Sequence, residues 1–185
     1  MNKKTQVIKL TEDLKRLVFD KPGDYRVVFK NISGEFLFDI QSPGVNLEIY
    51  GLYVGKGDDH FQLKTFQNHH IGKSRSNLLV KGVFFDQAKF FYEGLIRIEK
   101  EAQKSYAYQK NQNLVLSDDV FISSQPKLEI LANDVFCTHG STTGRLNKDQ
   151  IYYLKTRGLT EKQGENLLIK GFIREIEEKI IINNE

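Results

Sequence analysis

The chain has 185 residues, of which 39% are hydrophobic and 28% are charged, as in an ordinary soluble globular protein. Its net charge of +3 is too small to predict a nucleic-acid partner, and the basic residues are mixed with acidic ones. One cysteine excludes an internal disulfide, and the lack of a signal-like amino terminus or an apolar run of about 20 residues predicts a cytoplasmic protein without a membrane span.

The first twenty residues fit two local structures. Leu14, Leu17 and Val18 could form a helical stripe behind a Thr11 cap, and two short strands fit about as well. After a turn at Pro22, short alternating segments separated by Gly, Asn, Asp and Ser continue to about residue 139. The predicted strands are 25–29, 34–40, 45–54, 62–67, 77–83, 89–98, 114–116, 120–123 and 127–131.

The composition also favours strands for most of the chain, because alanine is rare while aromatic and β-branched residues are frequent. Regular short strands with turns between them indicate a sandwich, a barrel or a β-solenoid. Spacing alone does not choose among the three.

Helical periodicity replaces the strand pattern near the carboxy terminus. Asn147, with Gln150 three residues later, is expected to cap a first helix, and Gly158 is expected to end it in the left-handed conformation. Thr160, with Gln163 three residues later, is expected to cap a second helix. Its apolar stripe contains Leu168, Ile169, Phe172, Ile173, Ile176 and Ile180. The stripe packs on the β body, docks on a partner, or does both.

Cys137 and His139 are the pair with the clearest chemical potential. Residues i and i+2 of a strand point to the same face, so a thiolate and an imidazole would stand side by side. The pairing suits iron or zinc, or a nucleophile and its base, while a buried structural cysteine is the simpler interpretation. Two ligands are too few for a structural zinc or a conventional iron–sulfur cluster, so further ligands would have to come from a partner. We do not expect an enzyme, because phosphate-binding and hydrolase motifs are missing.

Residues 126–146 carry a more specific signal, PKLEILANDVFCTHGSTTGRL. This segment resembles the carboxy-terminal signature of the SufB/SufD family, which reads roughly P-x-L-E-I-x-A-D-D-V-x-C-x-H-G-A-T-x-G. The next segment, QIYYLKTRGL at 150–159, is similar to the family's F-Y-L-x-S-R-G-I helix. Upstream, FYEGLIRI at 91–98 and NLVLS at 113–117 resemble strand motifs of the same family. The resemblance covers about residues 69–180.

The resemblance implies a right-handed parallel β-helix over residues 1–145, with residues 1–20 ambiguous, and a helical hairpin over 146–185. It implies a non-catalytic scaffold subunit of a SUF-type iron–sulfur cluster assembly complex. Such a subunit pairs through its β-helix with a SufB-like subunit or a second copy, and its helical region docks a SufC-like ABC-type ATPase. The candidate docking residues are Ile151, Tyr152, Tyr153, Leu154, Arg157, Phe172, Ile173 and Ile176.

The resemblance also places the candidate site at the pairing surface. His139 would face the partner near the nascent cluster, and Cys137 is the candidate sulfur or metal ligand beside it. The isolated chain is expected to hold no cofactor stably, and iron or a cluster would bind transiently with a partner subunit.

The sequence departs from the family in ways that favour a SufD-like form. It is shorter than typical members, it lacks a second cysteine as sulfur acceptor, and Gly140 stands where the SufB-type motif has an acidic residue. Two alternatives remain at this point. One is a β-solenoid adaptor that binds an ATPase without taking part in assembly, and the other is a small cupin-type metalloenzyme, although its H-x-H motif is missing.

Overall fold

The computed structural model describes residues 5–180, which form eleven strands followed by two helices. Odd-numbered strands make one sheet: β1 (Gln6–Lys9), β3 (Gly23–Lys30), β5 (Val45–Gly55), β7 (Arg75–Phe84), β9 (Tyr106–Val115) and β11 (Phe136–Gly144). Even-numbered strands make the other: β2 (Arg16–Phe19), β4 (Gly34–Ile40), β6 (His60–His69), β8 (Lys89–Ile98) and β10 (Phe121–Ile130).

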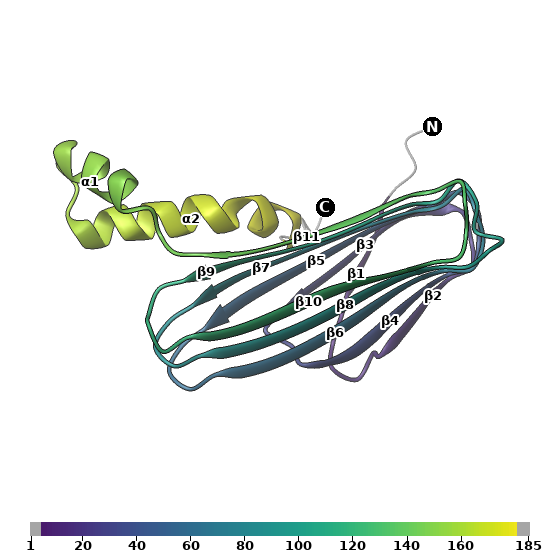
Figure 1. The fold of residues 1–185 in the computed structure, drawn as a ribbon, viewed down its shortest axis with the longest axis horizontal. Helices are drawn as coiled ribbons and strands as arrows, with labels where there is room; N and C mark the ends of the chain where they lie inside the picture. The colour runs from purple at the N-terminus through teal and green to yellow at the C-terminus, as the bar shows by residue number, and fades with distance from the viewer. Residues whose placement is uncertain (1–4, 181–185) are drawn as a thin grey trace.

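The chain winds between the two sheets as a parallel β-solenoid (Figure 1). It enters the two sheets in turn, and each strand pairs in parallel with the strand two places further along. The predicted solenoid is therefore confirmed. A cupin-type barrel is wrong for this chain, because cupins are antiparallel double sheets and every strand pair described here is parallel.

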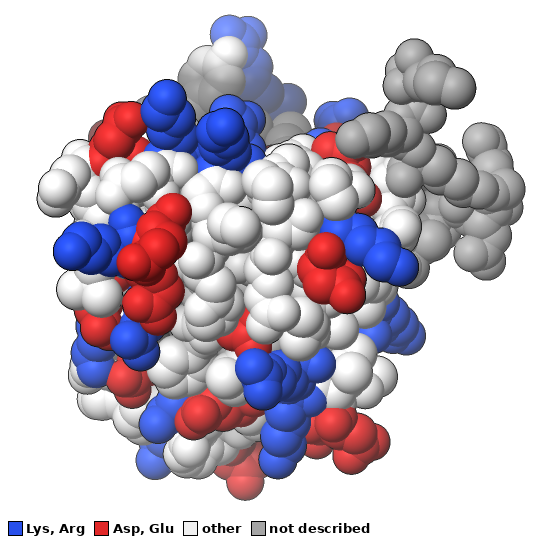
Figure 2. Space-filling model, turned by 90° about the vertical axis from the view of Figure 1, so that its right-hand side faces the viewer, with Lys and Arg blue, Asp and Glu red and all other residues white. Residues whose placement is uncertain are grey.

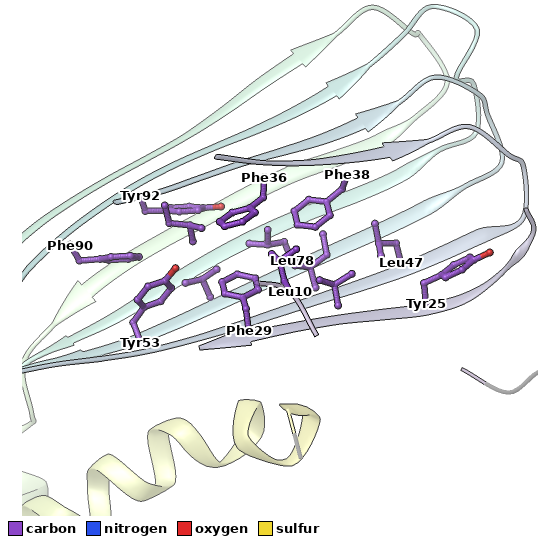
Figure 3. Packing of buried hydrophobic residues seen from close by; sticks show 14 of the residues in the cluster. Leu10, Tyr25, Phe29, Phe36, Phe38, Leu47, Tyr53, Leu78, Phe90 and Tyr92 are labelled. Carbon is purple, nitrogen blue, oxygen red and sulfur yellow. The ribbon is translucent and has the colours of Figure 1, made fainter. Parts of the chain in front are cut away.

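The core fills the space between the sheets with inward-facing apolar side chains (Figure 3). Phe36, Phe38 and Ile40 of β4 share the inner face, as their alternation predicts, and all three are fully buried. Phe36 stacks on Phe29 of β3 with ring centroids 6.5 Å apart, which joins the two sheets across the core. Full burial of one such side chain contributes about 1.5–3 kcal/mol of stability.

The corners of the solenoid stack loop upon loop. At the corner that leads from even to odd strands, Gly44, Lys73 and Lys104 each adopt a left-handed conformation, with φ of 74°, 58° and 61°. The Gly44 amide donates to the Lys73 carbonyl, and the Lys73 amide donates to the Gln103 carbonyl, each at 2.9 Å. Gly72 lies so close to the next loop that a Cβ would collide with the backbone of Gln103.

The amino-terminal end of the solenoid is closed. Residues 5–20 contain the two short strands β1 and β2, and not the helical alternative. Leu10 is buried in the main core cluster, and Ile8, Leu14 and Leu17 pack against that cluster. These apolar side chains cover the first turn, so this end of the core is shielded from water.

Two strands differ most from the predicted segments. β9 begins at Tyr106 and not at residue 114, because Gln109, Asn111 and Asn113 turn inward and hide the apolar alternation. β10 joins the two predicted segments through Pro126. A proline has no N–H to donate, and it is tolerated here because β10 is the edge strand of its sheet.

The carboxy-terminal helices are α1 (Lys148–Thr156) and α2 (Glu161–Ile180). Both predicted caps are confirmed: Asn147 accepts from the amides of Asp149 and Gln150, and Thr160 and Gln163 bond each other's amides. α2 lies along the outer face of the six-stranded sheet over β3, β5 and β7, whereas α1 packs on α2 and projects beyond the sheet (Figure 1).

Candidate functional site

The carboxy-terminal end of the solenoid is open. Within the described chain, β10 and β11 are the last strands of their sheets, so each has a neighbouring strand on one side only. α2 packs over β3, β5 and β7, away from this end. A strand edge without a partner presents unpaired backbone donors and acceptors and is a template for pairing with another chain.

The hydrophobic core is cut at the open end. Leu128 and Ile130 of β10 stand in register on Ile96 and Ile98 of β8 and continue the same inward-facing rows. Ile96 and Ile98 are fully buried, whereas Leu128 and Ile130 are 37% and 40% exposed because no further turn covers them. Leu131, directly after β10, is also exposed, whereas the exposed Phe121 and Phe136 lie on the outer faces of the last turn against Phe91 and Tyr106. A surface of this kind resembles a core divided in half, which is typical of obligate interfaces.

Cys137 lies on the inner face of β11 at this open end. It pairs in register with Ala107 and packs against the small apolar cluster that contains Ile96 and Ile98. The side chain is half-buried, and this burial raises the pKa of the Cys137 thiol to about 11. The thiol is therefore protonated at neutral pH, so it is not an activated nucleophile in the isolated chain.

His139 lies two residues further along the same strand. It pairs in register with the inward-facing Gln109 of β9, so it shares the inner face of β11 with Cys137, as the sequence predicts. His139 is exposed because the open end leaves its row uncovered. Further along β11, the Ser141 hydroxyl donates to the Ser124 hydroxyl of β10 at 2.8 Å and ties the two sheets together across the mouth.

Cys137 and His139 supply two donors that suit iron or sulfur chemistry, one thiol and one imidazole. Across residues 5–180, no group of three or more His, Cys, Asp or Glu side chains is placed to hold a metal ion. Two donors are fewer than the four of an ordinary structural zinc or iron–sulfur site.

A buried polar network lies inside the solenoid behind the open end, and the sequence analysis did not predict it. The His69 ring bonds the hydroxyls of Ser74 and Ser76, each at 2.8 Å, and Gln67 donates to Ser76 at 2.9 Å. Burial is the main cause that lowers the pKa of His69 to about 4. His70, as the alternation of a strand predicts, lies on the opposite face, where its ring is 3.3 Å from Asp39.

Comparison with known proteins decides the family. Residues 28–172 match the family described as SUF system FeS cluster assembly, SufBD core domain. The chain belongs to this family. The matched residues include strands β4 to β11, so the open end and the Cys137–His139 strand lie within the SufBD core domain.

Individual relatives agree with this assignment. The chain is 33% identical over 148 residues to an iron–sulfur cluster assembly SufBD family protein of Mycobacterium leprae, which covers 76% of the chain and 38% of the relative. It is 32% identical over 134 residues to SufD of Escherichia coli, at 72% and 32% coverage, and 35% identical over 121 residues to SufD of Bacillus subtilis, at 65% and 28% coverage. The chain thus spans about a third of the length of these relatives.

The helical hairpin of this SufBD-family chain exposes part of the predicted docking surface. Tyr152 and Tyr153 of α1 are 70% and 55% exposed, and the Arg157 guanidinium lies 5.1 Å from the centroid of the Tyr153 ring. Ile151 and Leu154 are half-buried. No residue of α1, which the structure describes in full, is buried.

The predicted docking residues on α2 are divided between two roles. Phe172 and Ile173 are half-buried, and the Phe172 ring lies against Lys81 of the solenoid. Ile176 is fully buried. In this structure the Ile176 side chain packs inside the molecule and is not accessible to a partner, and its docking role stays a prediction.

The surface charge of the chain is mixed. On the face that Figure 2 shows, Lys and Arg alternate with Asp and Glu around an uncharged band, and no single sign covers the face. In the part of the chain that the structure describes, no helix combines the length and apolar character that crossing a membrane requires.

Proposed function

We propose that this SufBD-family chain is a non-catalytic scaffold subunit of a SUF-type iron–sulfur cluster assembly complex. The observation that supports the proposal best is the open end of the solenoid, where a divided core surrounds Cys137 and His139 on one strand face. The family match and the SufD relatives supply the reaction context.

In this proposal the open end pairs with a SufB-like subunit or with a second copy of the chain. Pairing would cover Leu128 and Ile130 and continue the sheets at the β10 and β11 edges. It would also bring the partner's ligands to Cys137 and His139, which together provide half of an ordinary four-ligand set.

The iron–sulfur cluster is the cargo of this proposed site, and the proposal requires no resident cofactor. A thiol binds iron as the thiolate, so Cys137 must release its proton when iron arrives. The raised pKa of Cys137 keeps its thiol protonated and unreactive in the free chain. The positive charge of a bound iron ion would favour the thiolate instead. His139 is exposed at the open end, so it could bind iron without a rearrangement of the core.

An assembly assay tests the role of the pair. The double variant Cys137→Ser, His139→Ala is expected to reduce cluster formation, followed by visible absorption, on the complex with SufB-like and SufC-like partners. The matched control is Thr138→Ala, Thr142→Ala, because these two residues face the opposite side of the same strand. Unchanged cluster formation in the first variant would remove the pair from the mechanism and favour the adaptor role.

We further propose that an ABC-type ATPase docks on α1. Exposed Tyr152 and Tyr153 offer the aromatic surface that interfaces favour, and the predicted Arg157 lies beside them. Tyr153→Asp is expected to weaken co-purification with a SufC-like ATPase by at least about tenfold, as expected for a central aromatic contact. Val18→Asp, at an exposed apolar residue on β2, is the control. Equal retention of the ATPase by both variants would place the docking surface elsewhere.

A further inference from the structure

A lysine lies almost buried beneath helix α2. Lys81 belongs to β7, and its side chain is 7% exposed. Its ammonium group donates to the backbone carbonyl of Phe172 at 2.8 Å and to the Glu175 carboxylate at 2.7 Å. The same nitrogen lies 5.0 Å from the centroid of the Phe172 ring, within the range of a cation–π contact.

The surroundings of Lys81 are apolar on the β5 side, while Gln112 of β9 is in register with Lys81 on the other side. The strand alternation places Lys81 on the outer face of the six-stranded sheet, in register with Leu52 of β5. Leu52 is 3% exposed, and the outward-facing Val28 and Val83 are also buried. Ile176 is the buried apolar residue that α2 contributes. An apolar side chain at position 81 would suit this environment, so the charge requires a separate explanation.

A stabilising contact between α2 and the sheet does not explain why position 81 carries a charge. Removing an ammonium group from water costs several kcal/mol, and replacement of a buried ion pair by apolar residues is often neutral or stabilising. Glu175 is 63% exposed, so solvent screens its attraction for Lys81. The net contribution of the contact to stability is therefore small. Hydrophobic burial is also non-directional, so the apolar contact alone tolerates sliding and rotation of α2.

We propose that Lys81 is a positioning residue that fixes the register and rotation of α2 on the six-stranded sheet. Two hydrogen bonds of fixed direction, one to a backbone carbonyl, select one placement of the helix among those that apolar packing permits. Because α1 packs on α2, this placement also sets where α1 stands relative to the open end. The consequence for an ATPase docked on α1 rests on the proposed function.

Distance measurements between two spin labels test the placement in the isolated chain. The labels are attached at Tyr152→Cys on α1 and Lys64→Cys on β6, both exposed positions, in a Cys137→Ser background. Without further change the distance distribution is expected to be narrow. Lys81→Met is expected to broaden it or shift it by up to about one helical turn, 5 Å, while the circular dichroism stays unchanged.

Three further variants sharpen the test. Lys81→Arg keeps a cation that reaches the same acceptors and is expected to restore a narrower distribution, and Glu175→Gln is expected to broaden it partly. Glu178→Gln is the matched control, because Glu178 pairs with Arg174 on the exposed side of the same helix. A distribution in Lys81→Met as narrow as in the parent, with the same mean, would overturn the proposal. Loss of the helical circular dichroism signal in Lys81→Met would also overturn the proposal, because Lys81 would then hold α2 in its folded state and not merely select its placement.

A second experiment, with a SufC-like ATPase present, separates this inference from the proposed function. With a SufC-like ATPase, unlabelled Lys81→Met is expected to bind with unchanged affinity, while cluster formation on the complex falls by roughly tenfold, as misplacement of a coupled element predicts. If the parent chain does not bind the ATPase, the proposed function fails while the distance result for Lys81 stands. If Lys81→Met binds and assembles clusters like the parent, the positioning role has no functional consequence.

Discussion

At Cys137, burial acts on reactivity and on assembly at the same time. The apolar cluster beneath the thiol disfavours its charged form, while the open end leaves the side chain accessible to an incoming partner. A partner that seals the mouth without supplying a cation would bury the thiol further and keep it protonated. Iron delivered into the mouth would favour the thiolate.

The protonated state of Cys137 predicts slow alkylation. A pKa of about 11 lowers the thiolate fraction near neutral pH by roughly a hundredfold relative to an unfolded cysteine, so iodoacetamide should react with the native chain far more slowly. The rate is measured by mass spectrometry, and the urea-unfolded chain provides the reference. Similar rates in the two states would show that the thiol is not suppressed by its environment.

His69 predicts a loss of stability in weak acid. Its folded pKa of about 4 lies below the ordinary value of 6.5, so the unfolded chain binds the proton more readily between these values. The contribution of His69 to stability is complete above about pH 6.5 and is lost as the pH falls toward 4. Between about pH 7 and pH 5 the loss should be about 2 kcal/mol.

Urea unfolding at these two pH values measures the effect. The parent chain should lose about 2 kcal/mol more than His69→Gln, because the other titrating groups are common to both proteins. A difference in overall stability between the two proteins does not affect the result, because the free energy of unfolding at pH 5 is compared with that at pH 7 within each protein. An equal pH dependence in the two proteins would mean that His69 does not titrate in this range.

At the scale of elements, local signals predicted the helices better than the strands. The caps at Asn147 and Thr160 are short-range chemistry, so four residues of sequence were enough to place both helix starts. The prediction for β9 was too short because Gln109, Asn111 and Asn113 are buried amides: Gln109 donates to Gly94 of the opposite sheet, and Asn111 and Asn113 bond each other. No hydropathy pattern distinguishes such buried amides from an exposed loop. The inner-face pairing of Cys137 and His139 was predictable from strand spacing, whereas the network around His69 required the winding of the chain.

The stacked corners predict an asymmetric response to glycine substitution. Gly72→Ala places a methyl group against the backbone of Gln103, which cannot move without separating two turns, and should cost about 1–3 kcal/mol as overpacking does. Gly144→Ala is the control, since a Cβ there meets nothing within 4 Å. Chemical denaturation compares the two variants with the parent. Equal effects of the two substitutions would mean that the corner at Gly72 adapts.

On the scale of the whole molecule, the solenoid has one closed end and one open end. Leu10 and its neighbours shield the first turn, while Leu128 and Ile130 leave the last turn uncovered. The position of the family signature in the sequence therefore has a structural meaning, because residues 126–146 contain the second half of β10 and all of β11, the two strands of the open end. The same strands hold the divided core and the Cys137–His139 face, so pairing and cluster chemistry would depend on one surface.

This asymmetry predicts where pairing occurs. Ile130→Lys places a charge in the divided core at a position that is already 40% exposed, so the isolated subunit should fold while its association weakens. Val18→Lys is the matched control, because Val18 is 48% exposed and lies on the edge strand at the closed end of the same sheet. Analytical ultracentrifugation measures self-association of the chain alone and its association with a SufB-like subunit. Association should fall by at least about tenfold in Ile130→Lys, the effect of a charge in an interface core, and should persist in Val18→Lys. The opposite ranking would assign pairing to the closed end and separate it from the Cys137–His139 site.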